Sequence, residues 1–121
     1  MTNGSAVQEL DWYPKLNALA AQYGWRVKHD RAVQQANGRH LTALMGDPGW
    51  PDFTFSHPAR KITIFREIKG AKTRVEGDQK KWLASLAASG LDVDIWRMPD
   101  DWPRAVATLS FGRASPEQSL L

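Results

Sequence analysis

The sequence predicts an α/β domain in which a mixed β-sheet is flanked by helices. Apolar residues recur at helical spacing in residues 9–23, 78–89 and 101–109. The short runs between them alternate apolar and polar residues, which is typical of strands, and Gly or Pro residues separate the runs. The resulting order is helix, strand, two-strand hairpin, helix, strand, helix (αβββαβα), which places helices on the faces of the sheet.

The composition limits the class of protein. The chain has 121 residues, of which 42% are hydrophobic, and this suits one domain with a modest core. It has no cysteine, which excludes a disulfide framework and a thiolate zinc site. The sequence shows neither a signal peptide nor an apolar stretch of membrane-spanning length, so we expect a cytoplasmic protein without a membrane partner. The net charge of +3 weakly favours a polyanionic partner.

The first predicted helix spans Glu9–Tyr23. A proline is tolerated only in the first turn of a helix, so Pro14 leads us to expect that the regular helix begins between Asp11 and Pro14. Gly24 then ends the helix. Alternation over Trp25–His29 predicts a short strand.

The middle of the chain is predicted to form the hairpin. Residues 30–48 show no clear period, and we expect a long loop there. Residues 52–56 form the first strand, residues 57–60 the turn and residues 61–69 the second strand. In the second strand one face carries Ile62, Ile64 and Ile68, and the other carries Thr63, Phe65, Glu67 and Lys69.

The last third of the chain completes the domain. Residues 70–77 form a basic loop, Asp78–Ser89 an amphipathic helix and Leu91–Trp96 a strand. Asp100 or Asp101 caps a final helix that runs to about residue 109. We therefore expect a single domain over residues 1–111 and a disordered tail over residues 112–121.

Asp52, Glu67 and Lys69 are the candidate catalytic residues. Glu67 and Lys69 project from the same face of a strand, and the hairpin can bring Asp52 beside them. Two carboxylates can hold Mg²⁺ or Mn²⁺ and leave room for water and a phosphate oxygen, and the Ile68 carbonyl can supply a further ligand. The backbone of Gly49–Pro51 is restrained, which suits a positioned Asp52.

Each of these pieces also has an ordinary structural explanation. An Asp after a Pro is common in turns, and a Glu and a Lys two residues apart are usually a solvated pair. A functional site is favoured because Asp52 and the Glu-x-Lys pair fall on consecutive strands of one hairpin, so their proximity is expected from the fold.

The chain resembles a small stand-alone nuclease of the VRR-NUC family, a branch of the PD-(D/E)XK nuclease superfamily. The resemblance covers roughly residues 9–109 and rests on five segments in order. These are Gly24-Trp-Arg-Val-Lys-His29, Gly49-Trp-Pro-Asp-Phe53, Glu67-Ile-Lys69, Asp78-Gln-Lys-Lys-Trp-Leu83 and Ile95-Trp-Arg-Met-Pro-Asp-Asp-Trp102.

The resemblance implies a restriction-endonuclease-like sheet and a Mg²⁺- or Mn²⁺-dependent endonuclease that hydrolyses DNA phosphodiester bonds. Stand-alone members resemble phage-encoded enzymes that act on branched DNA, including Holliday junctions, often as homodimers. It also implies two further site residues. Glu9 would assist metal binding from the first helix, and the Gln79 amide would bind a water or a phosphate oxygen. The alternatives are an ordinary helix-start Glu and an ordinary polar residue in a first turn.

Basic and aromatic residues near these motifs are candidate DNA contacts. Their ordinary explanation is a solvated face. The candidate phosphate contacts are Arg26, Lys28, Arg31, Arg39, Lys72 and Arg74, and Trp50 can stack on a base or sugar. A chain with one metal site cuts one strand at a time, so we expect a homodimer. Apolar side chains outside the core would form its interface, with candidates Leu41, Leu44, Met45, Trp102 and Phe111.

Two other functions compete with an endonuclease. A nucleic-acid-binding module could keep the fold without cutting, although a complete Asp52, Glu67 and Lys69 set argues against a degenerate site. A nuclease subunit could depend on a partner for specificity, because 121 residues leave no room for a separate target-reading domain.

Overall fold

The computed structural model describes residues 5–30, 33–34, 40–41 and 45–112. The elements in chain order are α1 (Ser5–Gln22), β1 (Arg26–His29), β2 (Val33–Gln34), β3 (His40–Leu41), β4 (Phe53–His57), β5 (Ile62–Gly70), α2 (Gly77–Ala88), β6 (Asp92–Met98) and α3 (Trp102–Leu109).

Four strands form a mixed sheet in the order β1-β4-β5-β6. The β1–β4 and β4–β5 pairs are antiparallel, and the β5–β6 pair is parallel. A short turn joins β4 to β5, whereas the parallel pair requires the longer crossover that α2 supplies. The α/β class with a mixed sheet is therefore confirmed.

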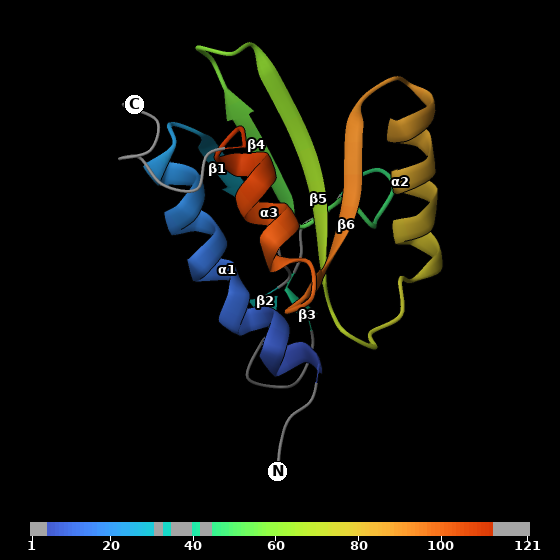
Figure 1. Cartoon of the computed structure of the whole chain (residues 1–121). Coiled ribbons are helices and arrows are strands. Elements are labelled where there is room, and N and C mark those ends of the chain that lie inside the picture. Colours follow the sequence, from blue (N-terminus) through green and yellow to red (C-terminus); the bar gives the residue numbers. More distant parts are fainter. Residues whose placement is uncertain (1–4, 31–32, 35–39, 42–44, 113–121) are drawn as a thin grey trace.

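Helices lie on both faces of this sheet (Figure 1). The main core forms where α1 and α3 meet one face. It consists of Leu16, Ala20, Trp25, Phe53, Phe55, Ile64, Ile68, Trp96, Met98, Ala105 and Leu109. The other face is covered in part by α2, where Trp82 packs against Trp50, which in turn packs against Phe65 of β5. Strand β5 thus has helices or aromatic side chains on both of its faces.

The start of the first helix differs from the prediction. Helix α1 begins at Ser5 and continues through Pro14 to Gln22. Pro14 has no N–H to donate to the carbonyl of Leu10. Leu10 is 49% exposed, so water can replace the lost helical bond, and packing of Leu16 and Ala20 into the core retains the helix.

The segment predicted as one long loop contains two short strands. Strands β2 and β3 pair with each other, with Val33 opposite Leu41 and Gln34 opposite His40. Asn37-Gly38 stands between them in the sequence, and this dipeptide is the strongest short-range signal for a hairpin. The prediction of a continuous loop is therefore wrong at β2 and β3.

The later elements lie close to their predicted bounds, with two differences. Strand β6 extends to Met98, beyond the predicted end at Trp96. Asp101 is the N-cap residue of α3, but its side chain makes no capping bond. Its Oδ2 accepts the N–H of Arg97 instead, at 2.8 Å. In the described part of the chain, no helix is long and apolar enough to cross a membrane.

Candidate active site

Asp52 directly precedes β4 and is held by three hydrogen bonds. Its carbonyl accepts the N–H of Asp30 at 2.8 Å, which extends the β1–β4 ladder by one residue. Its N–H donates to Oε1 of Glu67 at 3.3 Å, and its Oδ2 accepts the N–H of Ile68 at 2.9 Å. The carboxylate therefore occupies the position that a strand carbonyl would take opposite Ile68, and this fixes it against β5.

Glu67 and Lys69 project from β5 on the face opposite the main core. Ile68, which lies between them, is fully buried in that core. Glu67 is 1% exposed and Lys69 is 6% exposed. The Nζ of Lys69 lies 3.4 Å from Oε2 of Glu67. The structure thus brings Asp52, Glu67 and Lys69 together, as the hairpin and the two-residue period predict.

This group of side chains has more negative than positive charge when all three are ionised. Burial raises the pKa of Asp52 to about 6, against the lowering effects of the Ile68 N–H and of Lys69. Burial and the neighbouring charge of Asp52 raise the pKa of Glu67 to about 7, although Lys69 lowers it. Lys69 alone therefore does not offset the two buried carboxylates, and an additional cation would favour their ionised forms.

Glu9 approaches the same site from α1. Its Oε2 accepts the N–H of Gly70 at 3.2 Å, directly after Lys69, and its charge contributes to the raised pKa of Asp52. Across the described residues, however, no group of three or more His, Cys, Asp or Glu side chains is placed to hold a metal ion. Glu9 thus lies close to the two carboxylates, and its part in metal binding stays a prediction.

The donor set still fits a divalent ion of the Mg²⁺ type. Such an ion prefers oxygen ligands, retains several waters and is usually bound by only one or two protein carboxylates. Asp52 and Glu67 supply these, and burial raises the pKa of both carboxyl groups. The N–H of Ile68 donates to the Asp52 carboxylate. The predicted carbonyl ligand belongs to this same residue.

Gln79 has a structural role in α2. Its Oε1 accepts the N–H of Glu76 at 2.9 Å, and the Glu76 side chain accepts the Gln79 N–H, which forms a capping box. Among the described residues, no hydrogen bond joins Gln79 to Asp52, Glu67 or Lys69. The predicted contact with water or phosphate would therefore be made by the NH₂ group of the Gln79 side chain.

The exposed basic residues fall into two groups. Arg26 and Lys28 of β1 share the face of Phe65 and Glu67, because Lys28 pairs with Thr54 and Thr54 pairs with Phe65. Lys28 forms an ion pair with Asp30. Arg31 and Arg39 lie outside the described residues.

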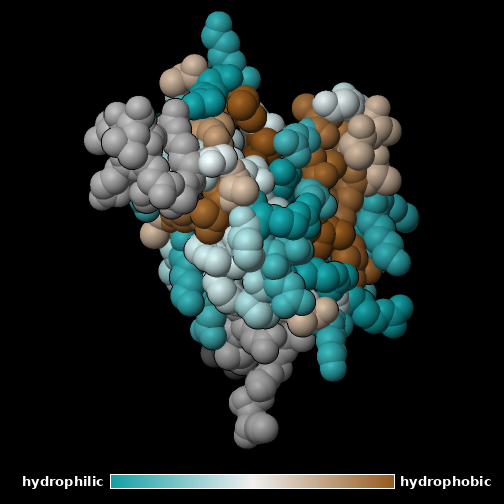
Figure 2. All heavy atoms as spheres, viewed as in Figure 1, coloured by the Kyte–Doolittle hydropathy of each residue, from teal (hydrophilic) through white to brown (hydrophobic). Residues whose placement is uncertain are grey.

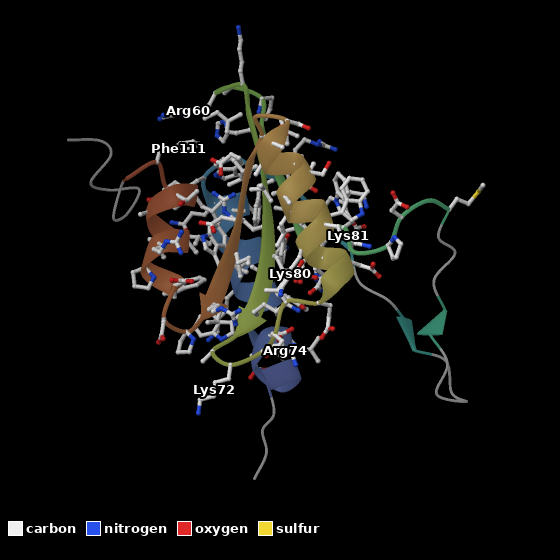
Figure 3. All side chains as sticks on the ribbon, turned by 90° about the vertical axis from the view of Figure 1, so that its right-hand side faces the viewer. Arg60, Lys72, Arg74, Lys80, Lys81 and Phe111 are labelled. Atoms are coloured by element: carbon white, nitrogen blue, oxygen red, sulfur yellow. The ribbon has the colours of Figure 1, made fainter. Side chains whose placement is uncertain are left out.

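Lys72 and Arg74 are exposed in the loop after β5. Figure 3 shows them near the end of α2 that carries Lys80 and Lys81, far from Arg60 at the other end of the sheet. Among the described residues, no ion pair involves these four cations. Their charge is therefore available to a polyanion.

Arg97 is a residue that the sequence analysis did not single out. It is the partner of Lys69 in the β5–β6 ladder. Its Nη1 donates to the carbonyls of Thr73 at 2.6 Å and Gly70 at 3.3 Å. It thereby ties the loop that carries Lys72 to the strand that carries Lys69. No local pattern reveals this role, because both acceptors are backbone carbonyls more than twenty residues away.

Two of the predicted dimer-interface residues are used within the chain. Trp102 packs against Trp12, with ring centroids 5.2 Å apart, and Phe111 stacks on Trp25 at 5.2 Å. Both pack against the core cluster, so the prediction that they stand outside the core is wrong. Met45 is 97% exposed. Leu44 lies outside the described residues, and Leu41 is described only as part of β3.

Comparisons of this chain with protein-family models, with curated proteins and with solved structures find no match.

Proposed function

We propose that this chain is a metal-dependent endonuclease that hydrolyses DNA phosphodiester bonds, with a restriction-endonuclease-like sheet of the VRR-NUC type. The observation that carries the proposal is the buried group formed by Asp52, Glu67 and Lys69 at the end of the β4–β5 pair. Burial of two carboxylates lowers the stability of the fold, so a stabilising role does not account for them. Buried ionisable groups of this kind are typical of functional sites, and two carboxylates beside one ammonium group suit phosphodiester hydrolysis.

Each residue has a distinct part in the proposed reaction. Asp52 and Glu67 would hold Mg²⁺ or Mn²⁺, which when bound supplies a water of lowered pKa and offsets charge on the phosphate. Lys69 is a compact cation beside Glu67, and it would orient the attacking water or neutralise charge on the phosphate oxygens. The N–H of Ile68 donates to the Asp52 carboxylate and the N–H of Asp30 donates to the Asp52 carbonyl, so Asp52 is fixed before substrate arrives.

We propose branched DNA, of the Holliday-junction kind, as the substrate and a homodimer as the active form. The described residues of one chain offer one such site, and symmetric cleavage of a junction needs two. Figure 2 supports a protein interface, because apolar side chains gather at the surface over β6 and α2. Leu91 is 43% exposed there, and Val93 and Ile95 of the edge strand β6 are half-buried. Light scattering with and without a bound junction measures the assembly.

Cleavage of labelled duplex, flap, single-stranded and four-way-junction DNA, each with Mg²⁺ and with EDTA, tests the proposal. We expect Mg²⁺-dependent cutting that is strongest on the branched substrates. Binding without cutting under every condition would favour the non-catalytic binding module. Cutting only after addition of a second protein would favour a nuclease subunit.

A further inference from the structure

A hollow of about 390 Å³ lies between α2 and the loop that precedes Asp52. Its lining consists of Asp47, Pro48, Asp78, Lys81, Trp82 and Ser85. Ligand pockets usually measure about 300 to 1,000 Å³, so this hollow is large enough for one small ligand group. In Figure 3, α2 faces the viewer, and Lys81 lies on this side of the molecule.

The wall of the hollow is rigidly joined to the active site. Gly49 has φ +100° and packs so closely on α2 that a Cβ there would lie 2.5 Å from the carbonyl oxygen of Asp78. Trp50 meets Phe65 edge to face, with centroids 5.6 Å apart, and Pro51 is fully buried. Asp52 follows directly. A group bound in the hollow is therefore held in a fixed relation to the Asp52 carboxylate.

The lining offers an aromatic ring and two carboxylates. The Nε1 of Trp82 already donates to the carbonyl of Asp47 at 3.1 Å, so the half-buried indole offers a ligand only the part of its ring surface that Trp50 does not cover. No ion pair or hydrogen bond within the described residues engages the carboxylates of Asp47 and Asp78 or the ammonium of Lys81. Two carboxylates repel a phosphate but accept hydrogen bonds from amino groups.

We infer that this hollow binds an unpaired nucleobase that carries an exocyclic amino group, next to the phosphate that is cut. This inference rests on the proposed nuclease function and adds a base-binding site to it. The base stacks on Trp82 and donates its amino group to Asp47 or Asp78. Lys81, exposed at the rim, binds the adjoining phosphate.

The site gives this domain a means of selecting branched DNA, the proposed substrate. A base in a duplex uses its amino group for pairing and both of its faces for stacking, so it cannot enter the hollow. A base at a flap or a junction can enter. Selection of branched substrates then depends on base capture beside Asp52, and no separate target-reading domain is needed.

The test measures binding by fluorescence anisotropy in EDTA, so that no cleavage occurs. The probes are one duplex with a single-stranded extension of cytosines, of thymines or of abasic residues. Thymine lacks an exocyclic amino group. Wild-type protein should bind the cytosine extension roughly tenfold more tightly than the abasic one, because stacking on an aromatic ring contributes that much per base, and more tightly than the thymine one.

The double variant Asp47→Ala/Asp78→Ala identifies the hollow, because alanine removes both acceptors of the amino group. Removing two negative charges should tighten binding to every probe, so the readout is the ratio of cytosine to thymine affinity, which should fall to one. The exposed Asp100→Ala is the matched control and should keep the wild-type ratio.

Three results bear against these proposals in different ways. Equal wild-type affinity for cytosine and abasic extensions overturns the inference and leaves the nuclease proposal intact. A base preference that persists in the double variant also overturns it, because the base is then bound elsewhere. Failure to bind or cut any DNA with Mg²⁺ overturns the nuclease proposal itself.

Discussion

Replacing Glu67 with glutamine should stabilise the metal-free protein above neutral pH. In the folded protein the pKa of Glu67 rises from 4.5 to about 7, chiefly because the carboxylate is buried. The folded state therefore binds more protons than the unfolded state between these two values, and the free energy of unfolding falls as pH rises through this window. Above this pH window Glu67 is ionised in both states, and the folded state carries the full free-energy cost of the buried charge.

The size of the effect follows from the shift. One pKa unit corresponds to about 1.4 kcal/mol, so an ionised Glu67 destabilises the fold by about 3 kcal/mol. Glutamine can still accept the N–H of Asp52, but it loses the ion pair with Lys69. The pKa of about 7 already includes the attraction of Lys69, so the expected net gain is about 3 kcal/mol, which corresponds to a rise in Tm of about 12 °C.

Thermal unfolding in EDTA, followed by circular dichroism at about pH 8 and about pH 5, measures this difference. The Glu67→Gln variant should melt above wild type at the higher pH and at or below it at the lower pH, where Glu67 is already protonated. Asp100→Asn, at an exposed position, should match wild type at both. A Glu67→Gln variant that is destabilised equally at both pH values would show that the Lys69 ion pair outweighs burial and would refute the reasoning.

Three further predictions concern metal, rate and DNA binding. Mg²⁺ or Mn²⁺ should raise the Tm of the wild-type protein more above pH 7 than below pH 6, because ionised carboxylates bind the ion; equal shifts would contradict this. Lys69→Ala should lower the single-turnover cleavage rate more than it lowers metal affinity measured by calorimetry, since lysine does not coordinate the ion. Lys72→Ala/Arg74→Ala should reduce the slope of log affinity against log salt by about 2. The control Arg60→Ala, at the other end of the sheet, should leave this slope unchanged. An unchanged slope in the double variant would show that Lys72 and Arg74 are only solvated surface residues.

The part of the site that could be predicted depends on local geometry. Glu67 and Lys69 share a face because side chains alternate along a strand, and the short turn after His57 brings β4 back along β5. The position of Asp52 follows from the same hairpin. These relations span few residues and need no knowledge of the rest of the chain.

The features that could not be predicted depend on contacts that are distant in sequence. Arg66 is 5% exposed, with its guanidinium 5.0 Å from the centre of the Trp96 ring and an ion pair to Asp92. Alternation in β5 cannot distinguish such a buried arginine from a solvated one. Pro14 predicts a later start of the first helix, whereas α1 continues through it, because packing of α1 on the sheet outweighs a local penalty of about 3 kcal/mol.

The most direct test of the central claim is Mg²⁺-dependent cleavage of a labelled four-way junction by wild-type, Asp52→Asn and Asp100→Asn proteins. In the Asp52→Asn variant the side-chain amide oxygen can still accept the N–H of Ile68, so the fold should persist while one carboxylate of the proposed metal site is lost. We predict that Asp52→Asn cuts at least about a hundredfold more slowly, because metal-supplied charge stabilisation is worth several kcal/mol, and that Asp100→Asn cuts at the wild-type rate. Equal cleavage by all three proteins would contradict a metal-dependent nuclease site at Asp52 and Glu67.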